Sequence, residues 1–162
     1  MIQIYSDNIQ KIIRNRKEIE NRLKVKIETK DKIIFINGNA ESGYLASIFL
    51  EAVNLGFSIN KALLLTDEEF TLEKIMIKSI TKRHNLSEVR ARVIGAKRKA
   101  MDTIENLTDC LIALHGNEVG IIGRREDVKK AAYAIRNIIA GSKHSAMYSY
   151  LEKKKAEEKQ SF

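Results

Sequence analysis

The residues best placed to do chemistry are cations that gather in one short stretch of the chain. Between residues 82 and 99, seven lysines and arginines face a single acidic residue, Glu88. Such a local positive field is the usual electrostatic signature of a partner with a phosphate backbone, although a Lys-rich protein can also carry a solvated basic face. Charge alone therefore favours nucleic acid as the partner, with an anionic membrane surface as a minor alternative.

The residue types that usually carry catalysis are scattered along the chain. His84, His115 and His144 show no metal-ligand spacing, and the single Cys110 falls in an expected strand without an activating neighbour. The sequence also lacks a Walker motif and the glycine pattern of a dinucleotide site. We therefore predict no enzymatic activity, no catalytic residue, no cofactor and no metal site.

Composition and charge distribution exclude several classes of protein. The chain has 162 residues, of which 44% are hydrophobic, and this is enough apolar material for a core. Residues 1–70 are electrically balanced, so residues 71–162 carry the whole formal net charge of +8. A single cysteine excludes a disulfide framework. The most apolar stretch, 44–57, contains Glu51 and Asn54, so we expect no membrane span. The amino terminus carries Asp7 and several lysines before any apolar run forms, so we expect no secretory signal and a cytoplasmic location.

The elements that must position the basic stretch follow from periodicity and stop signals. In the second half of the chain, we expect a strand at 71–80, a helix from an N-cap at Ser87 to Ile94, a break at Gly95, a helix at 97–107, strands at 110–115 and 118–122, and a helix at 125–140. In the first half, we expect a strand at 1–5, a helix capped by Asp7 and a second helix after it, strands at 24–29 and 32–36, a helix at 40–55, and a short linking helix at 58–65.

The two halves form an internal repeat. At one constant offset between the halves, Ile36 aligns with Ile121, and Gly38 aligns with Gly123. Each copy has the order β-α-α-β-β-α, and a last helix is expected at 145–160. The pattern predicts an α+β fold of two modules in tandem.

The second copy resembles a KH domain, a module whose Gly-x-x-Gly loop holds single-stranded nucleic acid. The resemblance rests on these motifs: Arg92-Val93-Ile94-Gly95, Thr103-Ile104-Glu105-Asn106-Leu107-Thr108, Val119-Gly120-Ile121-Ile122-Gly123 and Ala134-Ile135. The tail that follows, Gly141-Ser142-Lys143-His144 with Tyr148 and Leu151-Glu152, is similar to the archaeal ribosome-assembly proteins of the Dim-two type. Their eukaryotic counterpart is known as the partner of Nob one.

This resemblance implies two tandem KH domains with a C-terminal helix, divided into residues 1–70, 71–141 and 142–162. It implies an RNA-binding assembly factor of the small ribosomal subunit that binds the 3′ end region of 16S rRNA through the second domain. The implied protein partners are the Nob-one-type endonuclease and the alpha subunit of initiation factor two. An alternative from another class is a protein–protein adaptor that docks on the nuclease or the initiation factor without binding RNA.

The resemblance also indicates where RNA would bind. The implied RNA-binding residues are Arg90, Arg92, Val93, Ile94, Gly95, Ala96, Lys97, Arg98, Lys99, Ile112 and Leu114. Arg98 stands where the family has its second glycine. It either compensates through a charged phosphate contact or marks a loop now used for protein contacts. Ile112 and Leu114 share one strand face, opposite to Leu111 and Ala113, and the sequence leaves open which face meets RNA.

The first copy departs further from the family pattern. Residues 12–17, where a glycine loop belongs, contain no glycine. We therefore predict that the first module does not clamp RNA and instead packs against the second module or offers a protein-binding face.

Overall fold

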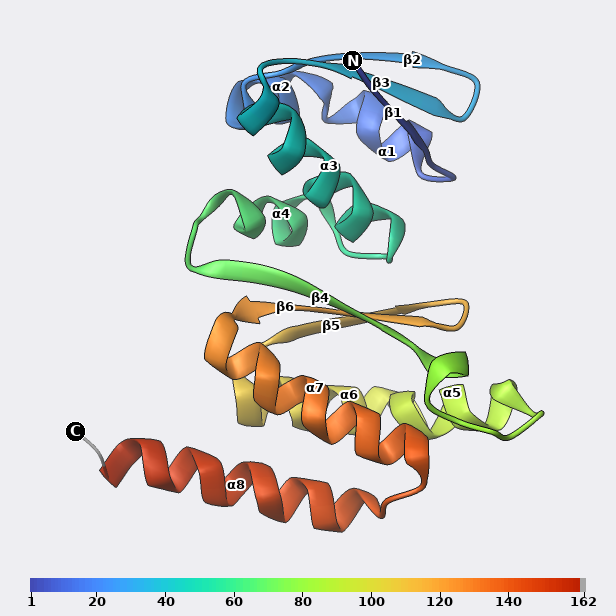
Figure 1. Ribbon diagram of the computed structural model, residues 1–162, viewed down its shortest axis with the longest axis vertical. Coiled ribbons are helices and arrows are strands. Elements are labelled where there is room, and N and C mark those ends of the chain that lie inside the picture. Colours follow the sequence, from blue (N-terminus) through green and yellow to red (C-terminus); the bar gives the residue numbers. More distant parts are fainter. Residues whose placement is uncertain (161–162) are drawn as a thin grey trace. The chain divides into compact units, whose positions relative to one another are not determined.

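The computed structural model describes residues 1–160, and the chain separates into two compact units, Met1–Phe70 and Thr71–Phe162 (Figure 1). The last two residues of the predicted 142–162 segment lie outside the described residues.

The first unit is a three-stranded sheet with its helices on one face (Figure 1). Its elements are β1 (Ile2–Tyr5), α1 (Ile9–Arg14), α2 (Arg16–Leu23), β2 (Lys26–Lys30), β3 (Ile33–Asn37), α3 (Ala40–Asn54), α4 (Ile59–Ala62) and a 3₁₀ turn at Leu63–Thr66. The strand order is β1-β3-β2, with Ile27 opposite Ile36. Both isoleucines are buried, as the inward positions of a half-covered sheet require. Phe49 and Leu50 of α3 are buried in the same unit.

The second unit carries the basic stretch. Its elements are β4 (Phe70–Met76), a 3₁₀ turn at Ile77–Ser79, α5 (Leu86–Ile94), a 3₁₀ turn at Ala96–Arg98, α6 (Lys99–Thr108), β5 (Leu111–His115), β6 (Glu118–Arg124), α7 (Arg125–Ala140) and α8 (His144–Gln160). The strand order is β4-β6-β5, which matches the order in the first unit. Helix α7 spans the predicted residues and ends at Gly141, whose φ is +116°. Leu151 of α8 is buried in the core of this unit.

Several predicted boundaries are wrong: α6 begins at Lys99 and not at 97, β2 begins at Lys26, and β6 extends to Arg124. In three further places a side chain or backbone group has another partner than the one predicted. Strand β4 stops at Met76, since the next residue begins a 3₁₀ turn and donates its N–H to the Asn117 carbonyl. Helix α5 begins two residues earlier than predicted, with the Asn85 side chain accepting from the Glu88 N–H. Asp7 does not cap α1, because its carboxylate accepts from Lys32 and from the Tyr5 hydroxyl.

Residues that the internal repeat aligns also make equivalent hydrogen bonds in the two units. A carboxylate oxygen of Glu20 accepts from the Ile27 N–H at 2.7 Å in the first unit. The equivalent Glu105 accepts from the Ile112 N–H at 2.8 Å in the second unit. Lys24 and Asp109 are equivalent at the same offset, and both have a left-handed backbone with φ of +56°. The repeat therefore extends from the sequence pattern to local geometry.

Candidate nucleic-acid interface

The basic stretch forms the junction between α5 and α6. Helix α5 ends at Ile94, and the loop from Gly95 to Arg98 leads into α6. Gly95 has a φ of +77°, and a Cβ there would lie 2.5 Å from the Ala100 nitrogen. Because backbone atoms cannot move aside, only glycine lets the end of α5 approach the start of α6 this closely.

Two non-glycine residues of this loop have left-handed backbones. The φ angles are +52° at Lys97 and +66° at Arg98. Arg98 therefore adopts a backbone conformation that glycine reaches at lower cost, at the position where the family pattern has its second glycine.

The Arg98 guanidinium is held by groups on α6 and β5. One nitrogen donates to Asp102 and, at 2.7 Å, to Glu105. The other donates at 2.9 Å to the Ile112 carbonyl. The hydrogen bond that Arg98 donates to Glu105 raises the pKa of Arg98 above its ordinary value, and the bond to Asp102 adds to this effect. Both terminal nitrogens of this side chain therefore face protein acceptors, and the phosphate contact expected of it stays a prediction.

Two cations of the loop remain available to a ligand. Lys97 and Lys99 are both exposed, and neither side chain makes a hydrogen bond or ion pair within residues 1–160. Ala96 is exposed between Gly95 and Lys97. Helix α6 begins directly after this loop, where the Lys99 N–H donates to the Ala96 carbonyl. The N-terminal end of the helix adds partial positive charge to the same place.

The two arginines of α5 have structural partners. Arg90 donates to the Asn117 side chain at 2.8 Å. Arg92 donates to the carbonyls of Ile138 and Ser142, each at 2.7 Å. The His144 ring lies 2.7 Å from the Arg92 carbonyl. Arg92 therefore joins the end of α5 to the start of α8, and its place beside an RNA groove stays a prediction.

Two of the apolar residues predicted to line that groove lie in the core instead. The exposed fraction is 1% for Val93 and 2% for Ile112, so their side chains cannot contact a base in this structure. Ile112 is opposite Ile121 in the sheet register and packs inward with it. Ile94 and Leu114 are only partly buried against the core and keep some exposed surface.

Sequence reasoning missed the acceptors that hold the arginines. Asp102 and Glu105 lie four and seven residues after Arg98 on one helical face, a spacing that indicates contact along a helix. That signal was present in the sequence. Asn117 and Ser142 gave no such signal, because they meet Arg90 and Arg92 only through the tertiary fold.

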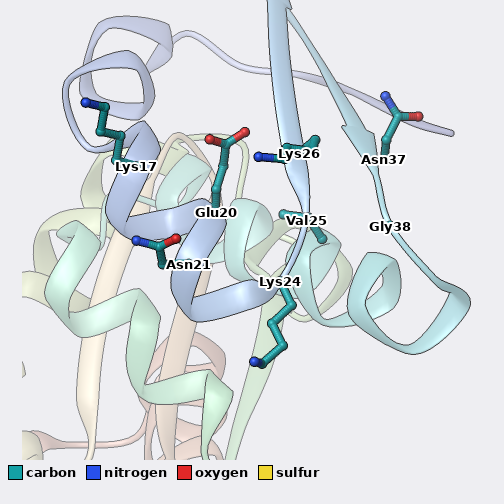
Figure 2. A pocket seen from close by; sticks show the side chains of 8 residues that line it. All are labelled: Lys17, Glu20, Asn21, Lys24, Val25, Lys26, Asn37 and Gly38. Carbon is teal, nitrogen blue, oxygen red and sulfur yellow. The ribbon is translucent and has the colours of Figure 1, made fainter.

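The first unit has no comparable loop between its two short helices. Asn15 lies at the junction of α1 and α2 with a φ of −110°, an ordinary value for an L-residue. The unit instead has an open hollow of about 630 Å³ (Figure 2). Its lining residues are Lys17, Glu20, Asn21, Lys24, Val25, Lys26, Asn37 and Gly38. Figure 2 shows Lys24 and Asn37 pointing to opposite sides, so the lining groups do not converge on one ligand.

Within residues 1–160, no group of three or more His, Cys, Asp or Glu side chains is arranged to hold a metal ion. None of the helices in that range is long and apolar enough to cross a membrane. Burial raises the pKa of the Cys110 thiol to about 11, so it is protonated at neutral pH and poorly reactive.

Comparisons with known proteins agree with the resemblance seen in the sequence. Residues 71–156 match the family described as eukaryotic type KH-domain (KH-domain type I). A KH domain-containing protein of Methanocaldococcus jannaschii is 31% identical over 86% of this chain and 65% of its own length. The RNA-binding protein PNO1 of Oryzias latipes is 31% identical over 80% of this chain and 57% of its own length. The chain thus spans less than two thirds of the length of these curated relatives.

Solved structures give the same result. Dim2p from Pyrococcus horikoshii is 30% identical with a TM-score of 0.83, and the match covers 94% of this chain and 99% of that one. A chain in the a/eIF2alpha–aDim2p–rRNA complex from the same organism is 29% identical with a TM-score of 0.87, covering 96% and 94%. The mixed α+β fold with two small sheets and the family predicted from the sequence are both confirmed. The chain belongs to the PNO1/Dim2 family of KH-domain proteins.

Proposed function

We propose that this protein is an RNA-binding assembly factor of the small ribosomal subunit that binds the 3′ end region of 16S rRNA through its second unit. The observation that carries the proposal is the exposed basic loop at Gly95, which places Lys97 and Lys99 beside the positive N-terminal end of α6. Relatives named as RNA-binding and pre-rRNA-processing proteins, and a neighbour solved with rRNA, support it.

We further propose that both units are KH domains, with boundaries at 1–70, 71–141 and 142–162 and with α8 as an addition to the second. The shared strand order and the equivalent bonds of Glu20 and Glu105 support a common origin. Only the second unit has a glycine between its first two helices, Gly95, followed by the left-handed residues Lys97 and Arg98. We therefore assign the RNA site to the second unit alone.

In this site, phosphates meet the loop and bases lie against the neighbouring apolar surface. Lys97, Lys99 and the backbone at Ala96 supply the phosphate contacts. The partly exposed Ile94 and Leu114 supply apolar contact for bases. If four nucleotides bind, the logarithm of affinity falls with the logarithm of salt with a slope of about −3, at about −0.7 per phosphate.

The proposed protein partners are the Nob-one-type endonuclease and the alpha subunit of initiation factor two, and the proposed place of action is the cytoplasm. The neighbour in complex with a/eIF2alpha and rRNA supports one of these partners. The second candidate function is a protein adaptor without RNA affinity. In either case we propose a protein-binding face on the first unit, because it lacks the glycine loop of the second unit.

Fluorescence anisotropy of a labelled RNA with the 3′ end sequence of 16S rRNA, titrated at several salt concentrations, tests the RNA site. We expect tighter binding than to a scrambled RNA of equal length. Replacing Lys97 and Lys99 by glutamine should weaken binding and reduce the steepness of the salt slope by about 1.4, since two phosphate contacts are lost.

The matched control replaces Lys30 and Lys61 by glutamine, because both are exposed in the first unit and the change in net charge is the same. This variant should bind RNA like the unmodified protein. Equal weakening by both double variants would mean that the basic loop acts only through net charge. An absence of RNA binding by the unmodified protein would favour the adaptor.

A further inference from the structure

The loop at the proposed RNA site has a backbone that its sequence does not favour. Lys97 and Arg98 are consecutive, both have positive φ, and neither is glycine. L-residues avoid this conformation because Cβ crowds the backbone carbonyl, so the surrounding structure must hold the loop in place.

The Arg98 side chain connects this loop to the neighbouring elements. Its planar fork joins α6 to the outer edge of β5, through Glu105 at 2.7 Å and the Ile112 carbonyl at 2.9 Å. Glu105 in turn accepts from the Ile112 N–H at 2.8 Å. Arg98 binds the Ile112 carbonyl and Glu105 binds the Ile112 N–H. Both backbone groups of Ile112 on this edge of β5 therefore have side-chain partners.

The two units differ in the cation that binds the glutamate at the strand edge. Glu20 makes the equivalent bond to the Ile27 N–H, so the carboxylate at the strand edge is common to both units. The cation beside Glu20 is Arg16, which lies within α2 at 3.6 Å. In the second unit the cation comes from the loop itself. Arg98 therefore links the loop conformation to the strand edge, and the first unit has no such link.

We propose that Arg98 is a positioning residue that takes the place of the second glycine by holding the left-handed loop through its side chain. It does not contact phosphate, and it orients Lys97, Lys99 and the N–H groups of α6 toward the RNA. This inference rests on the proposed function of the loop. It assigns the ionic part of RNA binding to the two lysines and gives Arg98 a conformational role.

The salt dependence of RNA affinity distinguishes a positioning residue from a residue that binds phosphate. We choose two variants with equal formal charge, R98M/D102N and R98G/D102N, because each loses one cation and one anion. Glycine adopts the loop backbone without help, and methionine does not. R98G/D102N should bind RNA within about twofold of the unmodified protein, whereas R98M/D102N should lose about tenfold because its loop is no longer held.

Both variants should keep the original salt slope, because no phosphate contact is removed. Equal loss of affinity in both variants, with the slope less steep by about 0.7, would show that Arg98 is a phosphate ligand and overturn the proposal. Circular dichroism checks that each variant folds. If R98M/D102N fails to fold, the affinity and slope of R98G/D102N alone decide between the two roles.

A measurement made in the absence of RNA tests this inference independently of the proposed function. Amide hydrogen exchange of residues 95–99 should be faster in R98M/D102N than in the unmodified protein and near the original rate in R98G/D102N. Unchanged exchange in R98M/D102N would refute the positioning role, whether or not RNA binds. Absence of RNA binding together with the expected exchange pattern would refute the proposed function alone.

Discussion

The cations of the 82–99 stretch have similar chemistry but different environments. Arg92 is bonded to two carbonyls and Arg98 to two carboxylates and a carbonyl, whereas Lys97 and Lys99 are exposed. Arginine presents several donors in a rigid fork, and this fork suits it to join elements of the fold. Lysine is a flexible point charge and stays available to phosphates. At the scale of single residues, the fold uses these arginines for structure and leaves the lysines exposed.

Cys110 gives a prediction about pH at the same scale. Its thiol is buried against Gly123, where a Cβ would lie 2.7 Å from the sulfur, and its pKa is raised to about 11. The unfolded thiol has a lower pKa, so its full contribution to stability is present below the unfolded value. That contribution is lost as pH rises through the folded value.

We therefore expect the thermal midpoint of the unmodified protein to fall between pH 9 and pH 11 more steeply than that of Cys110→Ala. Lysines and tyrosines titrate in both proteins, so the difference between the two curves isolates the thiol. Parallel curves would contradict the prediction. At neutral pH, the thiol should react with a maleimide only when the protein is unfolded.

At the scale of elements, the attachment of α8 explains why the tail motif accompanies this domain. Arg92 bonds to the carbonyls of Ile138 and Ser142, and the His144 ring meets the Arg92 carbonyl. The Gly141 backbone, with φ of +116°, turns the chain so that Ser142 can reach α5. The tail is thus joined to the helix that leads into the basic loop.

Arg92→Met should destabilise the protein by about 1–3 kcal/mol, because two carbonyls lose their donors. Amide exchange should accelerate first in α8. Denaturant unfolding and exchange measure these effects, with Arg83→Met as the control, since Arg83 is exposed. The salt slope for RNA should not change. A less steep slope in Arg92→Met would mean that this arginine does contact phosphate, as the family resemblance first suggested.

At the scale of the whole molecule, the two units share a strand order but differ in charge. The first unit is balanced, whereas the second carries the net charge of +8. Exposed charges act on a bound phosphate mainly within about 10 Å at ordinary salt, so binding at the loop depends on cations that contact the RNA there. Because the first unit lacks the glycine loop, we expect its lysines to make no such contact.

Replacing Lys17, Lys24 and Lys26 together by glutamine should therefore leave RNA affinity within about twofold and the salt slope unchanged. These lysines surround the hollow of the first unit. The same titration that tests the Lys97 and Lys99 variant measures this effect. Weakening with a less steep slope would show that RNA also reaches the first unit.

The sequence by itself determined the elements and their order. Helices α3 and α7 were predictable because apolar residues recur at helical spacing and glycine follows each end. The internal repeat was visible because equivalent core positions keep the same residue types. The family was predictable because the motifs around Gly95 and Gly141 are local in the chain.

Only the tertiary structure decided which side chains are available to a ligand. Strand β5 is apolar on both faces, so alternation could not show that Ile112 faces the core while Leu111 and Ala113 on the opposite face are only half-buried. The same holds for Arg92, whose acceptors lie 46 and 50 residues away in the sequence. Charge patterns are local, but hydrogen-bond partners depend on how distant segments pack, and that is settled only when the chain folds.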